Sequence, residues 1–214
     1  MLTKKEFWNQ KISSWEISKY KKSLKYLDIN SSVKFRLYLA SALLKQVSQE
    51  KHVLELGCGS GWLWDHIKLL NMKSYKGVDF SKIAIENFQK KVQNFKGQDR
   101  ISLSCEDCIK NTYSADIVVS LGLLDWIPTE KIRKIAENYK ESWYLHSFSE
   151  KRYSFSQIMH VLYSRVNYKI WTPQYRSADE LLSIFGPRAK IYRHPKLSFG
   201  AFIYHLPPHI KFQC

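Results

Sequence analysis

Short apolar runs alternate along this chain with stretches in which apolar residues recur every three or four positions. The runs are typical of β-strands, and the periodic stretches are typical of amphipathic helices. Such alternation predicts a mostly parallel sheet with helices on both faces. The expected strands cover residues 52–56, 74–79, 100–104, 115–121 and 142–148, and the expected helices cover 61–70, 82–93 and 128–140, the last with Pro128 in its first position.

The C-terminal part of the chain predicts one more helix and two adjacent strands. The helix covers residues 178–185 and stops at Gly186-Pro187, and the strands cover 189–193 and 199–205. At 214 residues the chain can bury a large core as a single α/β domain. Within it we expect an N-terminal helical lid (1–51), a core (52–149), a cap (150–176), and the last helix with the final strands (177–214).

The two flanking segments carry aromatic residues at helical spacing. In the lid, Phe7, Trp8 and Ile12 belong to a basic amphipathic pattern that continues past Tyr20. It predicts either a helix that packs onto the core or a helix on an anionic membrane, and we favour packing because apolar stripes are usually buried in their own domain. The cap predicts a helix over 155–163, whose His160 and Tyr163 are candidates for the wall of a substrate pocket, as is Tyr20 in the lid.

The excess positive charge lies outside the core. Lys and Arg against Asp and Glu number 11 to 4 in residues 1–51, 13 to 13 in 52–150 and 10 to 2 in 151–214, which gives the net charge of +15. This distribution predicts an anionic acceptor or surface, although solvated lysines on helix faces would give the same count. A nucleic-acid partner is not favoured, because the chain has neither a long basic run nor an aromatic RNA-binding signature.

The remaining composition indicates a cytoplasmic protein. The N-terminus does not read as a signal peptide, and no run of about 18 apolar residues indicates a transmembrane segment, which leaves peripheral membrane contact as an option. Four cysteines fit a reducing compartment. Cys105 and Cys108 form a single C-x-x-C without a second pair, so we expect no metal site.

The strongest motif is the run from Glu55 to Gly61, where an apolar strand leads into glycines at positions 57, 59 and 61. Glycines here let the backbone turn sharply and approach a ligand closely at the start of a helix. Dinucleotide-binding loops have the spacing G-x-G-x-x-G, whereas this loop has G-x-G-x-G preceded by an acidic residue. The motif therefore predicts a nucleoside-bearing cofactor whose phosphates, if any, do not lie on this loop.

This loop resembles motif I of the class I S-adenosylmethionine-dependent methyltransferases. Three later segments fit the same order: Val78-Asp79-Phe80, Cys105-Glu106-Asp107, and the run around Ser120-Leu121 that resembles motif IV. The resemblance implies a Rossmann-like fold with a seven-stranded, mostly parallel sheet closed by a C-terminal antiparallel hairpin. It implies S-adenosyl-L-methionine as the cofactor, with Glu55 and the glycines at its methionine end, Asp79 at the ribose and Asp107 at the adenine amine. The implied cofactor-binding residues are Glu55, Gly57, Cys58, Gly59, Gly61, Asp79, Phe80, Asp107, Ser120 and Leu121.

Methyl transfer from a sulfonium needs alignment of the acceptor, and a general base only where the acceptor atom starts protonated. Asp125 after motif IV and His146 at the end of the fifth expected strand are candidate bases, and Asp125 could equally cap the helix that begins near Pro128. Neither an Asn-Pro-Pro-Tyr-like turn nor a motif IV cysteine is present, which argues against methylation of adenine or of cytosine C5. We expect transfer to oxygen or nitrogen of a small molecule, either an acidic biosynthetic intermediate or a nucleotide-linked sugar. The alternatives are an RNA methyltransferase and a non-catalytic cofactor-binding partner.

Overall fold

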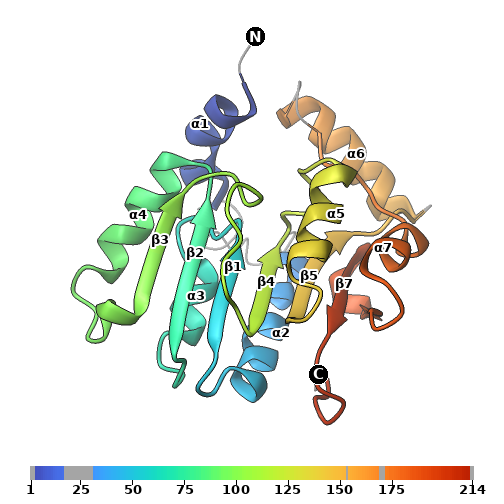
Figure 1. Cartoon of the computed structure of the whole chain (residues 1–214). Helices are drawn as coiled ribbons and strands as arrows, with labels where there is room; N and C mark the ends of the chain where they lie inside the picture. Colours follow the sequence, from blue (N-terminus) through green and yellow to red (C-terminus); the bar gives the residue numbers. More distant parts are fainter. Residues whose placement is uncertain (1–2, 17–30, 153, 169–171, 213–214) are drawn as a thin grey trace.

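The computed structural model describes residues 3–16, 31–152, 154–168 and 172–212, which form one seven-stranded sheet flanked by helices (Figure 1). The strand order is β3-β2-β1-β4-β5-β7-β6, in which β7 runs antiparallel to both of its neighbours and the other pairs are parallel. The strands are β1 His52–Leu56, β2 Ser74–Asp79, β3 Ile101–Cys105, β4 Ile117–Leu121, β5 Trp143–Ser149, β6 Lys190–Arg193 and β7 Gly200–His205. The helices are α1 Lys4–Glu16, α2 Ser31–Val47, α3 Trp62–Ile67, α4 Lys82–Val92, α5 Thr129–Asn138, α6 Phe155–Tyr168 and α7 Ala178–Phe185.

This architecture confirms the predicted fold, including the C-terminal antiparallel hairpin. Each strand boundary lies within two residues of the expected one. Pro128 was expected inside α5, but its extended backbone, with ψ of 159°, makes it the N-cap residue instead. The difference follows from the wide ψ range of proline, since its ring fixes only φ.

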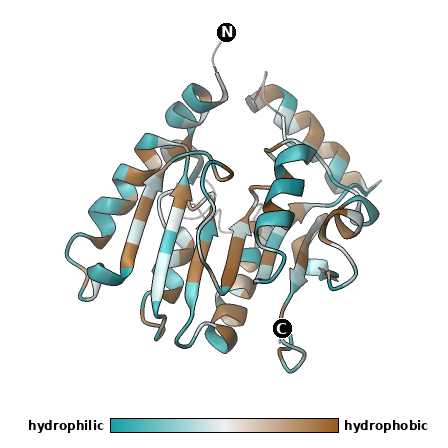
Figure 2. Cartoon of the chain, viewed as in Figure 1, coloured by the Kyte–Doolittle hydropathy of each residue, from teal (hydrophilic) through white to brown (hydrophobic). Residues whose placement is uncertain are grey.

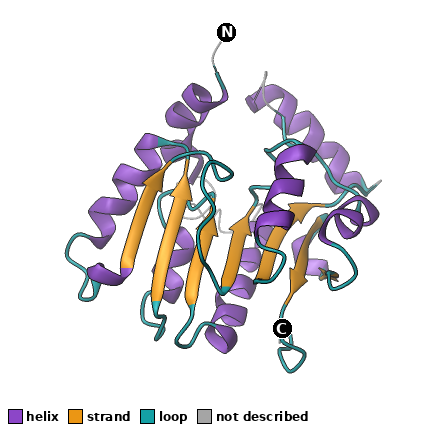
Figure 3. Ribbon diagram, in the orientation of Figure 1, coloured by secondary structure: helices purple, strands orange, loops and turns teal. Residues whose placement is uncertain are grey.

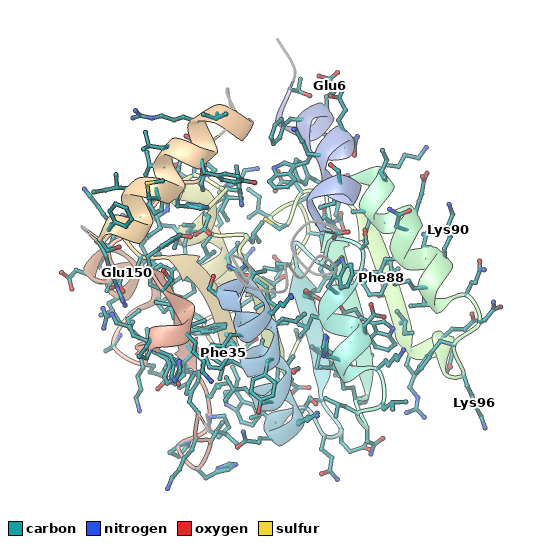
Figure 4. All side chains as sticks on the ribbon, turned by 180° about the vertical axis from the view of Figure 1, so that it is seen from behind. Glu6, Phe35, Phe88, Lys90, Lys96 and Glu150 are labelled. Carbon is teal, nitrogen blue, oxygen red and sulfur yellow. The ribbon has the colours of Figure 1, made fainter. Side chains whose placement is uncertain are left out.

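Two apolar layers cover the sheet, one on each face (Figures 2 and 3). Successive strand residues point to opposite faces, so Val53 joins the layer with α2, α3 and α4, and Leu54 joins the layer with α5 and α7. Figure 4 shows Phe88 pointing inward from α4, whereas Lys90 of the same helix points to solvent. The fold is thus held by a buried sheet between two helical layers.

The N-terminal flank divides into two parts, against the expectation of a single lid over 1–51. Helix α2 lies in the core, where Leu39, Leu43 and Leu44 are almost fully buried and the helix contacts α3. Helix α1 instead packs Phe7, Trp8 and Ile12 against α4. Packing of an aromatic stripe onto the outside of the core is thus seen for α1, and its role as a lid stays a prediction. No described helix is long and apolar enough to cross a bilayer.

Candidate functional site

The glycine-rich loop leaves β1 at its carboxyl end and has left-handed backbone at all three glycines. Their φ angles are 71° at Gly57, 53° at Gly59 and 77° at Gly61, a region that side chains rarely tolerate. A Cβ atom on Gly61 would lie 2.5 Å from the ring of Phe88, and Figure 4 shows that ring directed toward the strand side of α4. The sequence of the loop is thus dictated both by backbone conformation and by close packing.

Asp79 ends β2 and fastens this loop. Its Oδ2 accepts a hydrogen bond from the Gly59 amide at 2.9 Å, and its Oδ1 accepts one from the Ser81 amide at 2.9 Å. Burial raises the pKa of Asp79 to about 6, against the lowering effect of these amides. A carboxylate has further lone pairs, so Asp79 can still accept hydrogen bonds from a ligand. Ser81 caps α4 by accepting a hydrogen bond from the Ala84 amide.

A cavity of about 130 Å³ lies at the carboxyl ends of β1, β2, β3 and β4. Its lining is mostly apolar, with carboxylates from two neighbouring strands. Ligands of open α/β sheets bind at this edge, where the order of strands reverses between β1 and β4. The lining residues are Trp8, Gly57, Val78, Asp79, Phe80, Glu106, Asp107, Cys108, Leu123, Trp126, Ile127, Pro128 and Lys131.

Asp107 stands at the second acidic corner of the cavity. It forms an ion pair with Lys131 of α5 and accepts a hydrogen bond from the Ile109 amide at 3.3 Å. Partial burial acts to raise the pKa of Asp107, but the bond and charge of Lys131 hold it below its usual value. The carboxylate is therefore ionised at neutral pH and fixed in place from two sides.

Glu55 lies beneath the loop rather than in the cavity lining. It is buried and accepts a hydrogen bond from the Tyr75 hydroxyl on β2. Burial raises its pKa to about 8, with smaller contributions from the negative charges of Asp79 and Glu16. Glu55 therefore supports the loop from within the protein.

Glu16, which the sequence analysis did not identify, contacts the glycine loop from the end of α1. This last residue of α1 is buried, and its Oε1 accepts a hydrogen bond from the Ser60 amide at 2.8 Å. A Cβ atom on Gly59 would collide with the same oxygen. One signal was present in the sequence: Glu16 is the single acidic residue between Phe7 and Leu27. Three buried carboxylates, Glu16, Glu55 and Asp79, thus surround a loop that has no charged side chain of its own.

Comparisons with known proteins agree with this geometry. Residues 53–142 match the family model described as "Methyltransferase domain". Residues 53–142 therefore form a methyltransferase domain, and the chain has the fold of the class I methyltransferases. It is 30% identical over 157 residues to the malonyl-[acyl-carrier protein] O-methyltransferase of Priestia megaterium, an alignment that covers 68% of this chain and 53% of that protein. The chain thus spans about half the length of this curated relative.

Solved methyltransferase structures share the fold at low sequence identity. The magnesium protoporphyrin IX methyltransferase of Synechocystis PCC 6803, solved with bound SAH, aligns with a TM-score of 0.71 at 16% identity, over 94% of this chain and 96% of that one. The N-methyltransferase NodS of Bradyrhizobium japonicum WM9 aligns with a TM-score of 0.61 at 13% identity, over 92% and 98% of the two chains. These likenesses extend over nearly the whole domain.

Other residues that the methyltransferase motifs indicated lie outside the cavity lining. Cys58 is buried within the loop, where burial raises the pKa of its thiol. Ser120 is buried in β4 and its hydroxyl lies 2.9 Å from Nδ1 of His146. Leu121, the last residue of β4, is half-buried and packs against the core. The first residue after β4 that lines the cavity is Leu123, two positions beyond the end of the strand.

The side chain of His146 lies elsewhere than the sequence suggested. We expected it at the end of the fifth strand, but β5 continues to Ser149 and leaves His146 in its middle. It is 1% exposed, stacks on Tyr144 and contacts Phe185 of α7, so it faces a covering helix. Burial lowers its pKa to about 3, and the imidazole is therefore neutral at physiological pH.

Asp125 joins the loop after β4 to the end of β5. Its carboxylate accepts hydrogen bonds from the amide of Ser149 at 2.6 Å and from the hydroxyl of the same residue at 2.9 Å. Its backbone oxygen accepts one from Gln174 of the cap at 2.7 Å. Burial raises the pKa of Asp125 to about 6. The expected capping of α5 by Asp125 is wrong, because Ser149 takes both carboxylate oxygens.

The cap supplies α6, longer than the predicted helix over 155–163. His160 is half-buried, with its Nδ1 2.6 Å from the hydroxyl of Tyr175. Tyr163 is 45% exposed. Tyr20 lies outside the described residues. Neither His160 nor Tyr163 lines the cavity between β1 and α5.

Among the described residues, no group of three or more His, Cys, Asp or Glu side chains is arranged to hold a metal ion. Cys105 and Cys108 are both unbridged thiols. Cys108 lines the cavity beside Asp107, and burial raises its pKa to about 12. Cys108 therefore contributes a neutral thiol to the wall of the cavity, whereas Cys105 does not line it.

Proposed function

We propose that this chain binds S-adenosyl-L-methionine in the cavity and transfers its methyl group to oxygen or nitrogen of a small molecule. The observation that carries the proposal is the hydrogen bond from the Gly59 amide to Asp79. It fixes the glycine loop to an acidic residue that lines the cavity. The homologous O-methyltransferase and the structures solved with SAH or SAM support the same cofactor.

The residues present fit this cofactor. Asp79 has lone pairs for the two ribose hydroxyls, and Asp107 at the other acidic corner can accept from the adenine amine. Between them, Phe80 and Ile127 offer apolar walls to a flat base. The glycine loop, with the carboxyl groups of Glu16 and Glu55 nearby, would receive the cationic methionine end of the cofactor. When bound, the cofactor supplies an electrophilic methyl group on a sulfonium.

The protein's own part in the reaction is to position the acceptor and to exclude water from the cavity. Trp8 and Trp126 meet edge to face, with ring centroids 4.8 Å apart, and both line the cavity. This contact closes α1 over the loop that follows β4. We propose that Asp125 and His146 are positioning residues, because both are buried in polar or aromatic contacts away from the cavity lining. Alignment of the acceptor then supplies the rate enhancement.

We propose an anionic small molecule as the acceptor. The support is the placement of charge, since the flanks that border the cofactor-binding core carry an excess of +7 and +8. The homologue from Priestia megaterium acts, by its name, on a malonyl group, which is a carboxylic acid. Unbridged Cys105 and Cys108 agree with a cytoplasmic location, which we propose for the chain.

The test is incubation of the purified chain with methyl-labelled S-adenosylmethionine and a cell extract split into small-molecule, lipid, RNA and protein fractions. We expect label in the anionic small-molecule fraction, and loss of that label in Asp79→Ala. Label confined to RNA would replace the proposed acceptor. Cofactor binding without label in any fraction would indicate a non-catalytic binding protein.

A further inference from the structure

Helix α6 turns its large apolar side chains outward. Phe155 is 79% exposed and Val166 is 73% exposed, although both are residues that folding normally buries. The exposed residues fall at spacings of three and four, so that they share one face of the helix. They are Phe155, Ile158, Met159, Leu162, Tyr163 and Val166, and we call them the outer face of α6.

The inner side of α6 is held by polar contacts. Gln157 is buried, where its Nε2 donates to the Glu150 carbonyl at 2.8 Å and its Oε1 accepts from the Arg152 amide at 2.9 Å. One turn further along, Nδ1 of His160 lies 2.6 Å from the Tyr175 hydroxyl. An ordinary surface helix buries its apolar face and exposes its polar one. Because α6 does the reverse, burial in its own domain does not account for its outer face.

The chain around α6 is entirely basic in its charges. Residues 151–178 contain five Lys or Arg and no Asp or Glu, and Arg165 lies exposed on the helix itself. An apolar face with aromatic residues and basic neighbours is the pattern of a helix that lies in the interface of an anionic bilayer. An acidic bilayer surface complements both the charge and the apolarity of this segment.

The position of α6 adds to this reading. Figure 1 shows α6 and α1 at the same end of the molecule, toward which β2 and β3 point. The cavity lies at the carboxyl ends of these strands. Figure 2 shows brown, apolar segments along α6 at this end. A surface that contacts α6 therefore lies near the edge of the sheet that carries the cavity.

We propose that the outer face of α6 docks the protein onto the surface of an anionic lipid bilayer. The apolar side chains enter the interface between headgroups and acyl chains, and the exposed basic residues Lys151 and Arg165 contact the headgroups. The proposal rests on the exposure, polarity and charge of α6, and holds whether or not the cavity binds S-adenosylmethionine.

The experiment is flotation of the full chain with vesicles of phosphatidylcholine, either alone or mixed with phosphatidylglycerol. The test variant is Ile158→Gln with Leu162→Gln, two substitutions at exposed positions that leave the buried contacts of Gln157 and His160 intact. The matched control is Leu69→Gln, because Leu69 is 88% exposed and follows α3, far along the chain from α6.

We expect the wild-type chain and the Leu69→Gln control to float with the mixed vesicles and to bind phosphatidylcholine alone much more weakly. The double variant should bind the mixed vesicles roughly tenfold less tightly or worse, because two apolar side chains leave the interface. Arg165→Gln should weaken the same binding by roughly fivefold, the effect of one cation near the surface.

Absence of wild-type flotation with the mixed vesicles would overturn the proposal, as would equal flotation of the double variant. Sedimentation velocity provides a third route to rejection. A wild-type dimer that becomes a monomer in the double variant would show that the outer face of α6 binds a second copy of the chain, not lipid.

Discussion

Helices α1 and α6 stand at the same end of the sheet (Figure 1), but α1 buries its apolar side chains and α6 exposes its own. Helix α1 buries Phe7, Trp8 and Ile12 against α4, and its last residue reaches the glycine loop. Helix α6 buries Gln157 and exposes Phe155 and five further apolar residues. Both segments have aromatic residues at helical spacing and basic surroundings, so their patterns alone do not tell them apart.

This difference shows that an amphipathic pattern predicts a helix but does not predict whether its apolar face is buried or exposed. For α1 the direction is set by the apolar groups available on the core, such as Phe80 and Trp126. For α6 it is set by polar partners, because the buried carbonyl of Glu150 and the hydroxyl of Tyr175 need hydrogen bonds that only the polar side of the helix supplies. We therefore assign α1 to the cofactor site and α6 to an external surface.

The largest expected effect is from Trp8→Ala. Trp8 is 7% exposed and packs on Trp126, so its truncation should destabilise the docked α1 by about 3–5 kcal/mol. Hydrogen exchange of the α1 amides should show the loss, together with a lower melting temperature. Unchanged protection of α1 would contradict the assignment of this helix as a packed lid.

A smaller effect is expected at Glu16. Glu16→Ala leaves the buried Ser60 amide without the carboxylate, which should weaken the docking of α1 by about 1–3 kcal/mol. Glu16→Gln keeps an oxygen acceptor for the Ser60 amide, so its loss should be smaller. The same hydrogen exchange experiment compares the two variants, and a larger loss in Gln than in Ala would refute the contact.

The carboxylates beneath α1 should make stability depend on pH. The folded-state pKa values of Glu55, about 8, and Asp79, about 6, lie above those of the unfolded chain. Their stabilising contribution is therefore complete below about pH 4 and is lost as pH rises through 6 to 8. Near pH 7, Glu55 should lower the unfolding free energy by about 1 kcal/mol for each unit that the pH rises.

Urea unfolding at a series of pH values measures this slope, and Glu55→Gln should flatten it between about pH 6 and 8. The neighbours that bear charge or titrate around Glu55 are Tyr75, Asp79, Glu16 and Lys91. Segment 151–178 has no carboxylate of its own, so the variants of α6 should keep the wild-type pH profile. An unaltered slope in Glu55→Gln would place the proton uptake at another group.

The smallest effect is expected from Leu162→Ser. Leu162 is half exposed on the outer face of α6, so stability should stay within about 0.5 kcal/mol of the wild type. Thermal unfolding of Leu162→Ser and Trp8→Ala in the same buffer compares the two losses of stability. A loss comparable to that of Trp8→Ala would show that α6 is packed by its apolar face, and would remove the contrast between the two helices.

The sequence predicted the fold well because its strands are short apolar runs that end in glycine or acid. Gly57 and Asp79 mark the ends of β1 and β2 almost to the residue, since both positions have local conformational or capping requirements. The sequence could not predict Glu16, because its bond to Ser60 spans 44 positions. It misplaced His146, since the register of β5 and its extension to Ser149 decide which way that side chain points.

The most direct test of the cofactor site is calorimetric titration of S-adenosylmethionine into the wild-type chain, Asp79→Ala and Asp99→Ala. Asp79 fastens the glycine loop and faces the cavity, whereas Asp99 is an exposed acid before β3. We expect the wild type and Asp99→Ala to bind equally, and Asp79→Ala to lose about 1–3 kcal/mol of binding free energy, which is roughly 5- to 150-fold in affinity. Absence of binding to the wild type, or equal binding by Asp79→Ala, would contradict the proposed site.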